Sequence, residues 1–424
     1  MFIHEKDNWT DFKWNDSQIA AVMAEANRSV GYLNGRLSSI GFDRVQLTSL
    51  ETLTNDVVSS SAIEGIQLNT DEVRSSVARK LGIEIKEEKE PTHYVDGVVE
   101  MMMDAVYRYD LPLTEERLFN WHCALFPNGR SGNFPIRVGQ YRNEPMEVVS
   151  GSFGRERVHY RAVAPENVAS EMQKFIEWFN NPTVIPSITK SAIAHLWFVS
   201  IHPFDDGNGR IARALSDMVL SQMEKSALRF YSLSTEINQE KRAYYRVLER
   251  TQRGDGDITE WLSWYYKCLI QSVETANKKL SNVLNKSVFW TIHAGVTMNS
   301  RQVKILNFFL DGYDAKITQK NWAKYAEVSA DVASDDLNDL VSKGVLVEQK
   351  GKSRDGSYSI VYVKNEKYFS NVSISDSCGK HFISVVYQEK KYDELLSDLD
   401  YQRLLNEEIS ENDLSYKYFA YLLD

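Results

Sequence analysis

The sequence predicts a mainly α-helical protein with more than one domain. Apolar residues recur at intervals of three and four along most of the chain, most regularly at 193–201 and 211–219, which is the spacing of a buried helix face. Alternating runs, typical of strands, are confined to 138–160 and to the region before residue 363. With 424 residues, the chain exceeds one compact core, so we expect two or three domains.

The composition is that of a globular protein from a reducing compartment. Hydrophobic residues make up 43% of the chain, and a formal net charge of −10 argues against general binding to nucleic acid or anionic membranes. The three cysteines are far apart and form no CxxC pair, which fits the cytosol better than a disulfide or zinc framework. The first residues show no signal-peptide pattern, and no apolar run could span a bilayer. We therefore expect a cytoplasmic location without membrane contact.

The N-terminal region is predicted to consist of three helices. The first covers 16–40 and stops at Gly41, and the second begins near Asp43. Thr70 is the expected N-cap of a third, short helix that ends near Leu81-Gly82. The charged stretch that follows reads as a solvated linker into the next domain, and it occupies 84–91.

The following region is predicted to contain helices and one hairpin. Apolar spacing predicts a helix at 118–126 and two more at 165–180 and 188–201. Between them, the alternating runs of 138–160 flank Gly151-Ser152-Phe153-Gly154, which predicts a β-hairpin with its turn at these four residues.

The stretch after the last of these helices has the sequence His202-Pro203-Phe204-Asp205-Asp206-Gly207-Asn208-Gly209-Arg210-Ile211-Ala212-Arg213. Pro203 disfavours helical geometry at His202, so the helix should end there. The glycine-rich turn and the first turn of the next helix would direct unpaired N–H groups at one point, which makes an anion site. Arg210 and Arg213 are three residues apart, so both guanidinium groups can bind phosphate oxygens.

Two further residues of the stretch have chemistry that suits phosphate transfer. Asp206 supplies a hard oxygen ligand of the kind that holds magnesium together with substrate phosphates. His202 is the natural proton acceptor near neutral pH. Gly207 to Ala212 also fits a dinucleotide-binding fingerprint, but a helix precedes it where a strand is required, so we reject that interpretation.

As a whole, the stretch resembles the HxFx(D/E)GNGRxxR signature of the Fic family, which implies a helical core and transfer of AMP from ATP to a protein hydroxyl. The resemblance implies that His202 is the base, that Asp206 binds Mg²⁺, and that Arg213 holds the γ-phosphate. It assigns the α- and β-phosphates to 207–210 and places Phe204 in the core as the anchor of the loop. The expected nucleotide-binding set is Glu64, Pro203, Phe204, Asp205, Asp206, Gly207, Asn208, Gly209, Arg210, Arg213, Tyr244 and Tyr245.

A second match concerns the end of the second helix. Ser60, Glu64 and Gly65 fit the (S/T)xxxE(G/N) motif by which many Fic proteins hold themselves inactive. The resemblance implies that Glu64 pairs with Arg213 and displaces the γ-phosphate.

Other parts of a Fic core are less sharply defined. Gly139-Gln140-Tyr141-Arg142 resembles the start of the Fic flap, so a target protein is expected to dock along 139–160 by adding a strand. Tyr244 and Tyr245 could border the adenosine or could simply pack. Relatives often carry Asn-Arg where Glu240-Lys241 stand here, which weakens any assignment of base or ribose contacts.

The C-terminal part has the texture of a winged-helix module at 299–363, with a third helix at 329–341 and strands near 344–347 and 360–363. Such modules often read DNA through the third helix. Because that helix is acidic and positive charge is limited to the wing, we favour protein docking over DNA binding. The residues concerned are Asp331, Asp335, Asp336 and Asp339 on the helix, and Lys350, Lys352 and Arg354 on the wing.

These predictions divide the chain into an N-terminal inhibitory domain (1–90), a Fic core (91–275), a winged-helix-like region (276–363) and an acidic extension (364–424) with a helical run at 392–405. Two alternatives to AMP transfer stay open. One is an enzyme of the same fold that moves another phosphate-containing group or removes AMP. The other is a non-enzymatic regulator in which the winged helix acts and ATP is only sensed. A homodimer is also open.

Overall fold

A computed structural model describes residues 2–37, 42–150, 157–312, 315–349, 357–361, 370–377, 380–387, 390–406 and 411–419. The chain divides into two compact units, Met1–Ala276 and Asn277–Asp424, which are described separately. The helices of the first unit are η1 (Ile3–Glu5), α1 (Asp16–Leu37), α2 (Phe42–Ile63), α3 (Thr70–Leu81), α4 (His93–Tyr107), α5 (Glu115–Leu125), α6 (Pro165–Asn180), α7 (Ser187–Ile201), α8 (Asn208–Glu224), α9 (Leu233–Gln239), α10 (Lys241–Gln252) and the start of α11 (Thr259–Ile292). The fold is mainly helical, as predicted.

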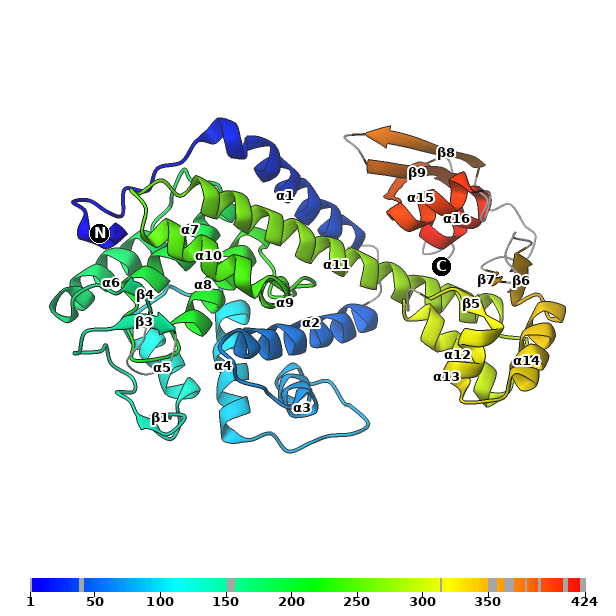
Figure 1. The fold of residues 1–424 in the computed structure, drawn as a ribbon, viewed down its shortest axis with the longest axis horizontal. Coiled ribbons are helices and arrows are strands. Elements are labelled where there is room, and N and C mark those ends of the chain that lie inside the picture. Colours follow the sequence, from blue (N-terminus) through cyan, green and yellow to red (C-terminus); the bar gives the residue numbers. More distant parts are fainter. Residues whose placement is uncertain are drawn as a thin grey trace. The chain divides into compact units, whose positions relative to one another are not determined.

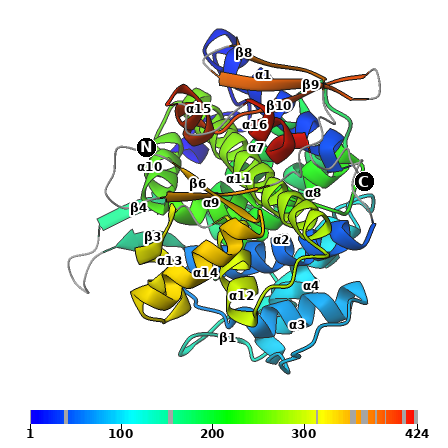
Figure 2. The same ribbon diagram turned by 90° about the vertical axis from the view of Figure 1, so that its right-hand side faces the viewer.

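The helices α7 and α8 form the centre of the first unit. Every residue of α7 except Ser187 and Lys190 is buried, and so is α8 from Arg210 to Ser221. In both views α1 lies on one side of this pair, and α2 and α3 lie on the other (Figure 1; Figure 2). The loop that joins α7 to α8 is therefore positioned by two helices that are themselves fixed by packing.

The three N-terminal helices are present, with one correction at a cap. The N-cap of α3 is Asn69, whose side chain accepts hydrogen bonds from the N–H groups of Asp71 and Glu72; Thr70, the predicted cap, is the first helical residue. At the other end Gly82 adopts a left-handed conformation, as expected of a C-terminal glycine. The predicted stop of the first helix, Gly41, lies outside the described residues.

The predicted hairpin contains β3 (Glu147–Ser150) and β4 (Arg157–Arg161), which pair antiparallel. The predicted turn at 151–154 lies outside the described residues. Residues 139–142 precede the strands and are not part of them, and they contact the loop after α7 instead. A second, very short pair, β1 (Arg130–Ser131) and β2 (Phe134–Pro135), was not predicted.

The second unit contains two small cores. The first comprises α12 (Ser300–Leu310), α13 (Gln319–Ala326), α14 (Ala330–Ser342) and an antiparallel sheet in the order β5-β7-β6 (Ile317–Thr318, Ser357–Ile360, Leu346–Gln349). Three helices and a hairpin occur in the predicted order. The last strand, predicted at 360–363, is β7, which ends at Ile360, and residues 362–363 lie outside the described residues. On α14, Asp336 faces inward and pairs with Arg301, and Asp339 pairs with Lys343. The wing residues Lys350, Lys352 and Arg354 lie outside the described residues.

The last part of the chain corrects the sequence-based prediction. Residues 392–395, the start of the helical run predicted at 392–405, lie instead in β10 (Lys390–Leu395), which forms an antiparallel sheet with β9 (Lys380–Tyr387) and β8 (Ser370–Ser377). A helix begins only at Asp398, in α15 (Asp398–Leu405), and α16 (Glu411–Phe419) follows. In the described residues, no helix is both long and apolar enough for a membrane span.

Candidate functional site

The loop between α7 and α8 is closed by its own residues. His202 ends α7 in a left-handed conformation (φ 53°), and Gly207 takes up the same region (φ 81°) immediately before α8. Between them, the side chain of Asn208 accepts a hydrogen bond from the N–H of Phe204 at 2.9 Å and donates one to its carbonyl at 2.8 Å. The Asn208 amide is therefore used inside the loop, and only its backbone N–H is left for a ligand.

The side of the loop that faces α5 is held by His122, a residue that the sequence did not indicate for this role. Phe204 is fully buried and stacks on His122 at 4.2 Å, which is the anchoring position expected of it. Since the N–H of Gly139 donates to Nδ1 of His122, the proton of His122 is on Nε2, which donates to the Asp206 carbonyl. Burial lowers the pKa of His122 to about 4, so this ring is neutral at physiological pH.

Arg142 fixes the other side of the loop. Its backbone N–H donates to the Pro203 carbonyl at 2.9 Å, and its guanidinium donates to the carbonyls of His202, Glu144 and Val163. The 139–142 segment, expected as the start of the flap, thus also supports the loop between α7 and α8. Contacts with backbone carbonyls leave no trace in the sequence, so this role could not be predicted.

His202 has the tautomer that a general base requires. Its Nδ1 lies 3.2 Å from the Val199 carbonyl, and because a carbonyl oxygen can only accept, Nδ1 must carry the proton. Nε2 therefore keeps its lone pair. Burial lowers the pKa of His202 below the ordinary 6.5, and the charge of Arg142 acts in the same direction. The imidazole is therefore neutral and able to accept a proton at pH 7.

The two arginines of α8 are buried with part of their hydrogen-bonding capacity unused. Arg210 is fully buried and donates to the Tyr94 hydroxyl at 2.7 Å. Within the described part of the chain, Nε and Nη2 of Arg210 and Nη1 of Arg213 have no hydrogen-bond partner. Buried donors without acceptors are costly, and these three lie beside the unpaired N–H groups of the first turn of α8. The arrangement fits a polyanion such as a chain of phosphates.

Glu64 is brought to Arg213. Its Oε1 accepts from Nη2 of Arg213 at 2.8 Å, and Ser60 accepts from the same guanidinium through its hydroxyl (2.9 Å) and its carbonyl (2.8 Å). A methyl group at Gly209 would lie 2.2 Å from Glu64 Oε1. The carboxylate therefore lies directly against the start of α8, beside Nη1 of Arg213, which has no hydrogen-bond partner among the described residues.

The end of α2 that carries Glu64 is held by several donors. Gly65 ends the helix at φ 82°, and the ammonium of Lys241 donates to the Ala62 carbonyl and the Tyr245 hydroxyl to the Ile63 carbonyl, both at 3.2 Å. A cation at a helix C-terminus is stabilising. Lys241 thus contacts the segment that carries Glu64.

The tyrosines predicted near the nucleotide differ from each other. Tyr244 is 2% exposed, and its hydroxyl lies 3.0 Å from Nε2 of His195, so it packs inside the core. Tyr245 is 39% exposed at the end of α2. Only Tyr245 has surface available for a ligand.

Asp206 has both carboxylate oxygens engaged. Oδ1 accepts from the N–H of Gly207 at 2.6 Å and lies 3.8 Å from Nη2 of Arg210, and Oδ2 accepts from the Ser131 hydroxyl. Ser131 lies on the unpredicted strand β1. No cluster of three or more metal-binding side chains occurs among the described residues, but Mg²⁺ commonly uses one carboxylate with water and substrate phosphates. A carboxylate held beside a phosphate-binding helix end fits that kind of site. The carboxylate of Asp205 accepts from the N–H of Arg137 at 2.8 Å.

The comparison with protein families agrees with this geometry. Residues 112–220 match the Fic/DOC family. The segment that matches contains α7, the loop and the first part of α8. Residues 2–83 match a separate family model, described as a domain of unknown function (DUF4172), and these residues include Ser60, Glu64 and Gly65.

Curated relatives of the Fic/DOC segment carry transferase names. The chain is 24% identical over 230 residues to "Protein adenylyltransferase Fic" of Nematostella vectensis, covering 53% of this chain and 48% of the relative. It is 31% identical over 155 residues to "Protein adenylyltransferase fic-1" of Caenorhabditis elegans, covering 36% and 28%. It is 33% identical over 119 residues to "Uridine 5'-monophosphate transferase" of Xanthomonas campestris pv. campestris (strain 8004), covering 26% and 21%. The match spans about half the length of these relatives or less.

Proposed function

We propose that this protein transfers AMP from ATP to a hydroxyl side chain of a target protein, and to itself, under the restraint of Glu64. The observation that carries the proposal is the set of buried, unpartnered guanidinium nitrogens of Arg210 and Arg213 beside the start of α8 and next to a neutral histidine. A binding site for a triphosphate and a proton acceptor are the two elements that nucleotidyl transfer needs. The names of the relatives in the Fic/DOC segment support the same reaction.

His202 would act as the base of the transfer. Nε2 of His202 takes the proton of the target hydroxyl as its oxygen forms a bond to the α-phosphorus of ATP. The bond from the α-phosphorus to the bridging oxygen breaks, and pyrophosphate leaves with that oxygen. The hydrogen bond from Nδ1 to the Val199 carbonyl keeps the ring oriented and stabilises the imidazolium that forms.

The start of α8 would hold the phosphates. The N–H groups of 208–210 and the guanidinium of Arg210 would bind the α- and β-phosphates, and Arg213 would bind the γ-phosphate. Asp206 would hold Mg²⁺, which when bound neutralises charge on the departing pyrophosphate. In an Asp206→Ala variant, the affinity for ATP should stop depending on magnesium. Titration of magnesium against nucleotide affinity measures this, and an unchanged profile would place the metal ligand elsewhere.

Glu64 would restrain the reaction by competing for Arg213. Arg213 already donates to Glu64 and Ser60, so the γ-phosphate cannot take its full place there while the carboxylate remains. ATP would then bind with its α-phosphate turned away from the attacking hydroxyl. We assign this restraint to the N-terminal domain, 1–90, and catalysis to the core, 91–275.

The target would dock along the 139–160 flap. A strand of the target added to the sheet of β3 and β4 places its backbone next to the loop, because Tyr160 of β4 donates to the Ser200 carbonyl at 2.7 Å, two residues before His202. The winged-helix-like region, 276–363, would serve protein docking.

Labelled ATP tests the proposal. The Glu64→Gly variant is incubated with a cell lysate and with ATP that is labelled either at the α- or at the γ-phosphate. Label from the α-position should appear in protein and label from the γ-position should not. Transfer of γ-label, or of neither label, would contradict AMP transfer.

A second candidate is transfer of another nucleoside monophosphate. It is favoured by the relative named a uridine 5'-monophosphate transferase, which is 33% identical to this chain over 119 residues. The phosphate site would be the same, and the base would be selected elsewhere. The mass added to the modified protein separates AMP from UMP, and loss of AMP from a modified target would indicate the reverse reaction.

A further inference from the structure

The face of α2 that contacts α8 near Glu64 also lies beside α8 further back along the helix. Asp56, Ser60 and Glu64 are spaced by four residues, so they lie in a row on the helix. On α8, Arg213 and Asp217 are also four residues apart. Ser60 and Glu64 contact Arg213, and the Asp56 carboxyl lies close enough to Asp217 to raise its pKa. The two rows therefore face each other over two helical turns.

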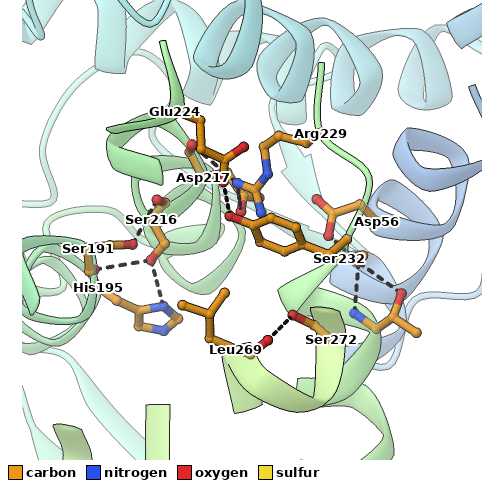
Figure 3. Close-up of polar contacts among 12 residues, drawn as sticks. Asp56, Ser191, His195, Ser216, Asp217, Glu224, Arg229, Ser232, Leu269 and Ser272 are labelled. Atoms are coloured by element: carbon orange, nitrogen blue, oxygen red, sulfur yellow. Dashed lines mark hydrogen bonds and ion pairs between the residues drawn. The ribbon is translucent and has the colours of Figure 1, made fainter. Parts of the chain in front are cut away.

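Asp56 belongs to a buried polar cluster, shown in Figure 3. The Ser232 hydroxyl, at the N-cap of α9, donates to Asp56. Arg229 pairs with Asp217, and Tyr231 donates to Glu224. We call this group the Asp56 cluster; its members are Asp56, Asp217, Glu224, Arg229, Tyr231 and Ser232.

The cluster contains more negative than positive groups. Three carboxyls face one guanidinium, and Asp56, Asp217 and Arg229 are each at most 5% exposed. Burial raises the pKa of Asp217 well above its usual range; Arg229 opposes the rise and the nearby Asp56 carboxyl adds to it. Burial also raises the pKa of Glu224. The other titratable groups that face the cluster are the phenols of Tyr231 and Tyr265. A proton on Asp217 removes the repulsion between two buried like charges.

We propose that the Asp56 cluster is a second anchor of the inhibitory helix, and that a proton held there makes the restraint by Glu64 depend on pH. This inference rests on the proposed function, in which α2 restrains Arg213. Asp56 lies two turns before Glu64 on the same face, so its hydrogen bond at α9 and its packing beside Asp217 of α8 position Ser60 and Glu64. Asp56 is a positioning residue, because it touches neither Arg213 nor the phosphate site.

The direction of the pH effect follows from the raised pKa of Asp217. A carboxyl whose pKa is raised in the folded state contributes full stability below its unfolded pKa, and this contribution is lost as pH rises through the folded pKa. Loss of the proton from Asp217 leaves its charge beside the buried Asp56 carboxyl. The anchor therefore weakens toward alkaline pH, and the end of α2 is released from Arg213.

Two substitutions at one position separate the anchor from its proton. Asp56→Ala removes the hydrogen bond to Ser232 and the carboxyl that faces Asp217. Asp56→Asn can keep both contacts, since the amide oxygen accepts from Ser232 and the NH₂ group can donate to ionised Asp217, so it does not depend on a proton on Asp217. Glu51→Ala removes an exposed carboxylate from the same helix and serves as the matched control.

Hydrogen exchange of 56–65 in the full chain and transfer from α-labelled ATP are measured from pH 6 to pH 9. In the wild type, exchange corrected for its intrinsic pH dependence should rise with pH, and so should transfer relative to Glu64→Gly. Asp56→Ala should raise both at every pH, by about tenfold if the anchor contributes ~1.4 kcal/mol. Asp56→Asn should stay protected and flat, and Glu51→Ala should follow the wild type. In the Glu64→Gly background, Asp56→Ala should add nothing to transfer.

The outcomes distinguish this inference from the function on which it rests. If Glu64→Gly activates transfer while Asp56→Ala changes neither exchange nor transfer, the anchor is wrong and the restraint stands. If Glu64→Gly does not activate, the restraint fails and the anchor's regulatory role fails with it. Should Asp56→Ala not fold, the comparison of wild type with Asp56→Asn decides, because equal pH profiles would overturn the proton dependence.

Discussion

The two ends of α8 both border buried arginines but treat them differently. Toward the C-terminal half, Arg229 meets the Asp217 carboxylate, with Glu224 also nearby. At the start of the helix, Arg210 has only a tyrosine hydroxyl at hydrogen-bond distance, and Arg213 has the partly exposed Glu64. Three of the six guanidinium nitrogens of Arg210 and Arg213 lack a hydrogen-bond partner among the described residues. The internally neutralised end fixes the fold, whereas the incompletely satisfied end is suited to a ligand.

The largest expected effect concerns catalysis at the incompletely satisfied end. His202→Ala should lower transfer by about 10²–10⁴-fold, the usual contribution of a positioned base. ATP should still bind, because the donors at the start of α8 do not depend on the imidazole. Binding of a fluorescent ATP analogue and transfer of α-label are measured side by side. Near wild-type transfer would show that the start of α8 binds nucleotide without His202 as the base.

The next effect concerns stability at the neutralised end. Arg229→Leu should lower the free energy of unfolding by about 3–5 kcal/mol, because it leaves buried carboxylates without their cation. Arg213→Leu should lower it less, since Glu64 is 28% exposed and can turn to solvent. Chemical denaturation compares the two variants, with the exposed pair of Arg250 and Glu260 as a control of about 0–1 kcal/mol. Equal losses for Arg229 and Arg213 would remove the contrast between the two ends.

A smaller effect is expected where Arg213 meets Glu64 at the end of α2. Glu64→Gly should raise transfer about tenfold or more, since ~1.4 kcal/mol shifts a two-state balance tenfold. Adding Arg213→Ala should abolish the gain, because the released guanidinium is its source. Rates with α-labelled ATP measure both variants. A gain that survives in the double variant would show that Glu64 acts through some other residue.

The smallest effect is on the pH profile. Because burial lowers the pKa of His202 below 6.5, its neutral form persists into mildly acidic solution. The acidic fall in transfer should therefore lie below pH 6.5, and the profile of kcat in Glu64→Gly measures it. An acidic fall at or above pH 6.5 would indicate that the ring is solvated during the reaction.

Much of the candidate site could be predicted, because its residues are neighbours in sequence. The run from His202 to Arg213 specifies a helix end, a turn and a helix start locally. The Ser60–Gly65 pattern could be paired with this run because both resemble motifs of one family. The supporting contacts of Ser131, Tyr94 and Arg142 could not be predicted, since they join positions that are 60 to 116 residues apart. Such contacts are set by packing and carry no periodic signal.

The tail shows a different limit of sequence reasoning. Tyr392, Leu395 and Leu396 are spaced as on a helix, yet Tyr392 and Leu395 lie in β10, which pairs with β9. The sheet is stabilised by burial of Ile383 and Val385 from another segment. Long-range pairing thus overrides a helix-like pattern.

A helix cap is also hard to place to the residue. The predicted N-cap of α3 was Thr70, and the structure has Asn69 there.

Glu64 lies so close to Gly209 that its carboxylate fills the space at the start of α8. A single methyl group there would already overlap Oε1 at 2.2 Å, so a phosphate oxygen entering the same volume must displace the carboxylate. In the proposed restraint, the carboxylate is a tethered competitor of the γ-phosphate, present at the high effective concentration that a covalent link provides. Its strength is set by the rigidity of α2 as much as by the ion pair itself.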